Sequence, residues 1–121
     1  MWLMIAALNL ATAVVLGAFG AHGLEKMANA QQLAWWATAT DYFFYHALGL
    51  LALAILNKIN GLFPIKLSFI CLQIGILLFC GSLFLMGLGS KGLGMITPIG
   101  GLFMIIGWLS LAFHALKYRN M

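Results

Sequence analysis

The chain alternates between long apolar stretches and short polar or glycine-rich breaks. The apolar stretches run over residues 2–21, 35–56, 64–86 and 98–116. Each is close to the length of about 20 residues that an α-helix needs to cross the hydrocarbon core of a bilayer. The pattern predicts an all-α fold in which residues 1–121 form a single domain, an integral membrane bundle of four transmembrane helices.

The breaks carry signals for the ends of helices. Residues 23–32 are rich in polar side chains and suit a short helix at the membrane surface, whereas residues 87–94 are a glycine-rich turn. Pro64 and Pro98 suit the first turn of a helix, where a missing backbone N–H costs nothing. Thr97 directly precedes Pro98, and we expect it to cap the N-terminus of the fourth helix.

Composition supports the same class of protein. Hydrophobic residues make up 64% of the chain and charged residues 7%, against about 25% charged residues in soluble domains. So few charged side chains cannot cover a water-soluble surface, and most of the surface is therefore expected to contact membrane lipids. The net charge of +4 does not indicate nucleic-acid binding, because the basic residues lie scattered at the ends of apolar stretches and form no single patch.

The basic residues also predict how the chain lies in the membrane. With four spans, the N-terminus, the 57–66 loop and the C-terminal tail share one side. That side holds Lys58, Lys66, Lys117 and Arg119, and the other side holds Lys26 and Lys91. Because basic residues accumulate on the cytoplasmic side of a membrane protein, both termini are expected in the cytoplasm.

The second apolar stretch carries the clearest pattern of polar side chains. Helical spacing places Thr38, Asp41, Tyr42, Tyr45 and Gly49 on one face, with His46 one turn after Tyr42. Ionisable groups are costly within the membrane, so we predict that this face points into the bundle. The first interpretation is a buried hydrogen-bond network that fixes helix register. A proton or ion relay and a pocket for a polar ligand are the functional alternatives.

Asp41 needs a partner at this depth, and His22 is the predicted one. His22 ends the first stretch on the side of the membrane where the second stretch begins. Its fixed place at a helix end favours it over Lys91, whose long side chain can reach water. The third histidine, His114, lies near the opposite end of the fourth stretch, so a zinc site built from three histidines is not expected.

Small residues recur along the first stretch, at Ala13, Gly17 and Ala21. A strip of this kind lets another helix approach closely in lipid. We interpret it first as a packing surface for a neighbouring helix of the same chain. The alternative is a contact between copies in a homo-oligomer.

One motif in the chain is accidental. Residues 87–92 match the G-x-G-x-x-G pattern of dinucleotide-binding proteins. That fingerprint requires a preceding strand and an acidic residue about 20 positions further on, whereas here a membrane span precedes it and no acidic residue follows Asp41. We therefore predict no catalytic, cofactor-binding or metal-binding residues.

Four strings in the chain resemble those of a known family of small membrane proteins. They are residues 17–23 (GAFGAHG), Tyr42-x-x-x-His46, residues 79–84 (FCGSLF) and residues 97–101 (TPIGG) followed by Gly107-Trp108. In this order they resemble the YgdD-like family, over essentially the whole chain. The resemblance implies four spans and, for bacterial members, an inner-membrane location. Members carry a domain of unknown function, so the resemblance implies no reaction.

These observations favour a protein that acts through contacts with lipids or other proteins and is not an enzyme. A membrane enzyme would need at least two convergent reactive groups, and only His22, Asp41 and His46 are candidates. The alternative function is a small oligomeric channel or carrier that uses the polar stripe of the second span. A wet cavity that reaches His46 would favour that alternative.

Overall fold

A computed structural model describes residues 1–119 of the chain, and the ordered elements in this range are all helical. They are α1 (Trp2–His22), the 3₁₀ turn η1 (Leu24–Lys26), α2 (Ala30–Ile59), α3 (Lys66–Gly75), the π-helical turn η2 (Ile76–Cys80), α4 (Gly81–Gly87) and α5 (Ile96–Lys117). Because α3, η2 and α4 are continuous, the described residues contain four segments long and apolar enough to span a membrane. The predicted fold class is therefore confirmed.

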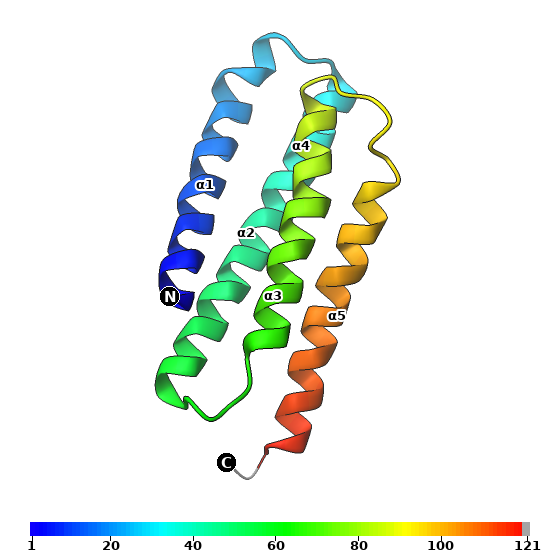
Figure 1. Ribbon diagram of the computed structural model, residues 1–121. Helices are drawn as coiled ribbons and strands as arrows, with labels where there is room; N and C mark the ends of the chain where they lie inside the picture. Colours follow the sequence, from blue (N-terminus) through cyan, green and yellow to red (C-terminus); the bar gives the residue numbers. More distant parts are fainter. Residues whose placement is uncertain (120–121) are drawn as a thin grey trace.

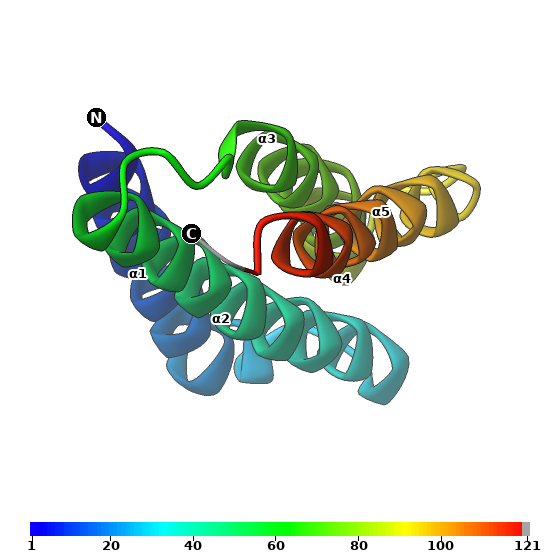
Figure 2. The same cartoon turned by 90° about the horizontal axis from the view of Figure 1, so that it is seen from below.

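The four spans are arranged with two helices in the middle and two on the outside (Figure 1). The central pair is α2 and the continuous α3–α4 segment. On the outside, α1 packs chiefly on α2, and α5 packs on α3 and η2. Viewed nearly along the helices, α1 and α5 lie at opposite ends of the molecule (Figure 2). The core sits between the central helices, where Leu50, Phe69 and Leu72 are buried.

The helix α2 is longer than its apolar stretch predicts. It begins at Ala30 because Asn29 and Gln32 form a capping box, in which each side chain accepts a hydrogen bond of 2.8 Å from the other residue's backbone N–H. Its 30 residues correspond to about 45 Å, more than the hydrocarbon thickness of about 30 Å. Therefore either the ends of α2 extend beyond the hydrocarbon core, or the helix is tilted within it.

The third span contains the π-helical turn η2, and α5 packs directly against it. A side chain at Gly100 of α5 would place its Cβ 2.2 Å from the backbone nitrogen of Phe79. Only glycine allows this approach, which brings two helix backbones together in the way that small residues do in membranes.

The start of α5 corrects one expectation. Thr97 is not the N-cap, because the helix begins one residue earlier, at Ile96, after Met95. The Thr97 hydroxyl instead forms a hydrogen bond with the hydroxyl of Ser82 in α4. The preceding turn contains Gly89 and Gly92 with φ of +106° and +80°, values that glycine adopts without strain.

Candidate functional site

The polar residues of α2 do not face the interior as predicted. Thr38 and Asp41 are exposed on the surface of the chain, and so are Tyr42 and Tyr45, whose exposed fractions are 40% and 62%. The opposite side of α2, with Trp36, Ala39 and Phe43, is the one that the other helices bury. The prediction of a buried network is therefore wrong for these four residues. We call Thr38, Asp41, Tyr42 and Tyr45 the α2 polar face.

His46 is the member of the predicted stripe that is buried. Its ring lies parallel to Tyr42 with centroids 6.0 Å apart and also faces Trp108 of α5, 5.9 Å away. The Nδ1 atom lies 2.8 Å from the backbone carbonyl of Tyr42, one turn earlier. A carbonyl oxygen only accepts hydrogen bonds, so Nδ1 carries the proton and His46 is held within its own helix.

The predicted pairing of His22 with Asp41 is absent from the structure. Both side chains are exposed, and within residues 1–119 neither takes part in a side-chain hydrogen bond. His22 ends α1 on its exposed side, whereas Asp41 borders the groove between α1 and α2. The candidate reactive groups His22, Asp41 and His46 are therefore not brought together. The described residues also contain no group of three metal-binding side chains.

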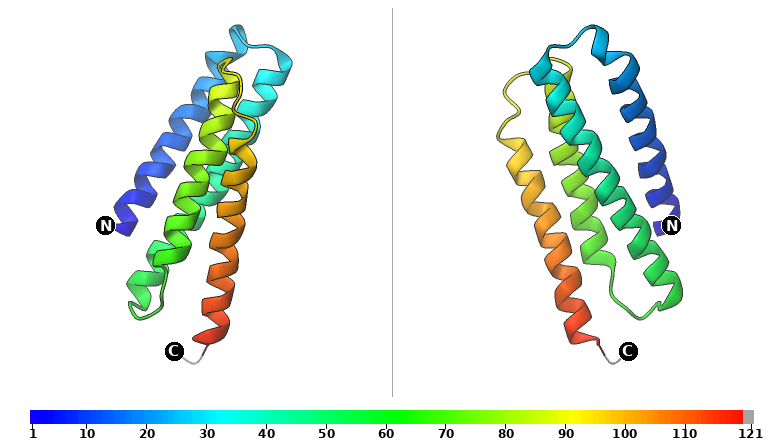
Figure 3. Two further views of the ribbon diagram at one scale, coloured as in Figure 1. Left: turned by 45° about the vertical axis from the view of Figure 1, so that its right-hand side comes forward. Right: turned by 180° about the vertical axis from the view of Figure 1, so that it is seen from behind.

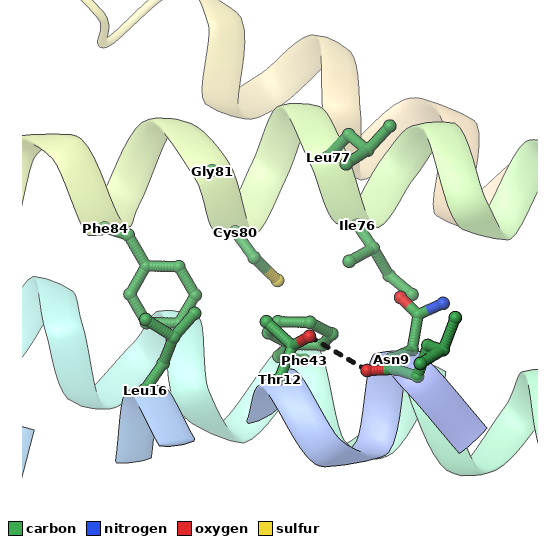
Figure 4. Close-up of a pocket in the computed structure, with 10 residues that line it drawn as sticks. Asn9, Thr12, Leu16, Phe43, Ile76, Leu77, Cys80, Gly81 and Phe84 are labelled. Carbon is green, nitrogen blue, oxygen red and sulfur yellow. Dashed lines mark hydrogen bonds between the residues drawn. The ribbon is translucent and has the colours of Figure 1, made fainter. Parts of the chain in front are cut away.

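A groove of about 330 Å³ lies between α1 and the η2–α4 segment (Figure 4). Leu16, Phe43 and Phe84 are among its mostly apolar walls. Its two polar residues are satisfied within the chain, because Thr12 donates to the carbonyl of Leu8 over 2.8 Å and Asn9 is bonded to another helix. The groove therefore presents a mostly apolar surface without an unsatisfied polar side chain.

A second groove, of about 380 Å³, runs between α1 and α2. The two acidic residues of the chain, Glu25 and Asp41, both line it, together with Trp36. His46 lines neither of these two grooves, and it lines neither of two further hollows, one beside the 88–95 turn and one between α4 and α5. These cavities therefore give the channel alternative no support.

The sequence did not indicate the polar contact between α1 and α3. The side-chain amides of Asn9 and Gln73 bond to each other in both directions, over 2.8 and 3.1 Å. Each is a neutral amide within a largely apolar span, and this was the signal that the sequence offered. Their pairing depends on the register of two helices that are 64 residues apart, and no sequence pattern sets that register.

The small residues of α1 are used for packing within the chain. Ala13 is fully buried, and a Cβ at Gly17 would lie 3.2 Å from the Thr40 methyl group of α2. A Cβ at Gly20 would lie 2.4 Å from the ring of Trp36. The first interpretation of the strip is thus confirmed for Ala13 and Gly17. Ala21 remains exposed, and a homo-oligomer remains a prediction.

The four apolar helices define the class of this protein, a small four-span integral membrane protein. Its biochemical activity is unknown, and the described residues bring no reactive groups together. The chain belongs to the family described as Protein of unknown function (DUF423), whose model matches residues 16–101.

Similar proteins agree with this class. UPF0382 membrane protein SSP2132 of Staphylococcus saprophyticus is 44% identical, covering 96% of this chain and 97% of the relative. UPF0382 membrane protein YwdK of Bacillus subtilis is 40% identical, with 97% of each chain covered. A UPF0382 membrane protein of Haemophilus influenzae is 39% identical, covering 99% of this chain and 97% of the relative. No solved structure matches the chain.

Proposed function

We propose that this protein acts by contact with another membrane protein along the α2 polar face, and that it is not an enzyme. The observation that carries the proposal is the exposure of Asp41, Tyr42 and Tyr45 on a helix that spans the membrane. Polar and ionisable groups inside a membrane are almost always turned toward protein or water. An exposed set on one helix face therefore fits a surface that a protein partner covers.

The remaining surface fits contact with lipids. The large exposed residues of α5 are mostly aliphatic, and the groove between α1 and η2–α4 has no unsatisfied polar side chain. Catalysis is disfavoured because His22 and Asp41 are exposed and are not hydrogen-bonded to each other, and His46 is bonded to its own helix.

We also propose that the protein resides in a bacterial inner (plasma) membrane with both termini in the cytoplasm. The relatives are membrane proteins of bacteria, and the YgdD-like resemblance implies an inner-membrane location. Four of the six basic residues fall on the side of the termini, which is the cytoplasmic side by the usual distribution of Lys and Arg.

Photocross-linking in living cells tests the contact. A photoreactive amino acid replaces Thr38 on the α2 polar face or, as the control, Ile105 on α5, which is 56% exposed. We expect protein adducts from position 38 and only lipid adducts from position 105. Lipid adducts alone at both positions would contradict the proposal.

A further inference from the structure

We infer that the partner on the α2 polar face is a second copy of this chain, paired through α2 about a twofold axis perpendicular to the membrane. The inference rests on the proposed function and names its partner. It depends on three features of α2. The first is a carboxylate that receives no hydrogen bond, and the second is a pair of tyrosine hydroxyl groups that donate none. The third is a row of exposed residues with the spacing found in paired helices.

The acceptor is the carboxylate of Asp41. It lies eleven residues after the start of α2, or about 16 Å along the helix. This is within the central 30 Å or so of a helix about 45 Å long. Asp41 is exposed, and no side chain among the described residues donates a hydrogen bond to its carboxylate. A carboxylate at this depth needs donors, because an unpaired one is costly in hydrocarbon.

The donors are the hydroxyl groups of Tyr42 and Tyr45. Both side chains are exposed, and neither hydroxyl is hydrogen-bonded within residues 1–119. The two residues follow Asp41 by one and four positions, which is about 1.5 and 6 Å along the helix axis. No Lys or Arg lies in the middle of a span, so a second copy would satisfy Asp41 with hydroxyl groups and not with a cation.

A twofold arrangement makes these groups complementary. Two α2 helices related by an axis along the membrane normal run parallel and in register, so Asp41 of each copy lies level with its counterpart. The tyrosines of the other copy begin about 1.5 and 6 Å further along the axis, and helical side chains point back toward the N-terminus, which brings the Tyr45 hydroxyl toward the partner's Asp41. Each hydroxyl donates to the partner's carboxylate, and each contact occurs twice. This reciprocity is the requirement of an isologous dimer interface.

The spacing of exposed residues on α2 fits helix pairing. The intervals between them alternate between three and four, the repeat of helices that coil around one another. The seam comprises Thr38, Asp41, Tyr45, Leu48, Ala52 and Ile55, all exposed. Viewed from behind, α2 lies in front of the α3–α4 segment (Figure 3, right). Because all six seam residues are exposed, no other part of the described chain covers the seam.

The test uses purified full-length protein in vesicles of phosphatidylethanolamine and phosphatidylglycerol. Copies that carry donor or acceptor fluorophores at the C-terminus are mixed, and energy transfer is followed as lipid dilutes the protein. We expect Tyr45→Phe to raise the dissociation constant on the order of tenfold, since it removes two symmetric hydrogen bonds of the strength usual in membranes. Tyr118→Phe removes a hydroxyl outside the seam and should change nothing.

Three outcomes overturn the pairing: wild-type protein that stays monomeric at every dilution, equal dissociation constants for Tyr45→Phe and wild type, or equal effects of Tyr45→Phe and Tyr118→Phe. The cellular cross-linking separates this failure from failure of the proposed function. Adducts of position 38 with other proteins, beside a monomeric purified protein, would overturn the self-pairing alone. The absence of any protein adduct would overturn both.

Discussion

The exposed faces of α2 and α5 differ in chemistry although both helices are long enough to cross the same bilayer. On α5 the exposed residues include Leu102, Ile105 and Leu109, each more than half exposed. The exposed face around the middle of α2 instead presents Thr38, Asp41 and Tyr45. Lipid tails suit the first surface and not the second. Under the proposed function, α5 is a lipid-facing helix and the exposed face of α2 is covered by protein in the membrane.

The largest expected effect comes from giving α5 the acidic residue that α2 carries. Ile105→Asp should reduce insertion of the fourth span by about 3 kcal/mol, the cost of an aspartate near the centre of a membrane helix. The measurement is the inserted fraction of this span in a translocation assay, with Ile105→Leu as the control. Equal insertion of the Asp and Leu variants would show that the two faces do not differ as described.

A second prediction concerns the buried side of α5, at two adjacent glycines. Gly100→Ala should destabilise the protein by about 2 kcal/mol, the usual scale of overpacking, because the new methyl group meets the Phe79 backbone at 2.2 Å. Gly101→Ala should be tolerated, since its methyl group would lie 3.6 Å from the Phe79 ring. Unfolding in a denaturing detergent measures both, and equal stabilities would contradict the packing of α5 on η2.

The Asn9–Gln73 pair gives a contrast with the α2 polar face, because its polar groups are satisfied within the chain. Asn9→Leu leaves the Gln73 amide unpaired and should cost about 1 kcal/mol of unfolding free energy. The double change Asn9→Leu with Gln73→Leu should recover part of that loss. Additive losses in the double variant, measured in the same detergent titration, would show that the two amides act independently.

The smallest effect is expected from the basic residues on which the proposed orientation rests. Replacing Lys58 and Lys66 by Asn should weaken the preference for cytoplasmic termini without abolishing insertion. Reporters fused to the C-terminus and inserted near Lys91 measure the two sides. An external C-terminus in the wild-type protein would reverse the proposed orientation.

The spans could be predicted from sequence because the bilayer sets their length. The side of α2 that is buried could not, because in a membrane protein both faces of a helix are largely apolar and periodicity alone does not say which face packs. The polar spacing of Thr38, Asp41 and Tyr45 correctly placed them together, but their direction depends on where α1 and the α3–α4 segment lie. The extension of α2 to Ala30 depended on the capping box between Asn29 and Gln32, a signal present in the sequence.

The pairing of polar groups was equally dependent on three-dimensional register. His22 was chosen for Asp41 from its level in the membrane, yet both side chains are exposed, and no hydrogen bond joins them within residues 1–119. A shared depth in the membrane is not sufficient for two residues to pair, because their side chains must also point toward each other around the helix axes. Asn9 and Gln73 meet both conditions and form the bonded pair.

The accessibility of the α2 polar face to the lipid phase tests the central claim most directly. Nitroxide probes attached to Thr38→Cys or Ile105→Cys report collisions with oxygen, which concentrates in the hydrocarbon core, in membranes prepared from the producing bacterium. If α2 is covered by protein, the probe at position 38 should be shielded while the probe at position 105 is fully accessible. Equal accessibility at the two positions would mean that α2 faces lipid as α5 does, and would contradict the account.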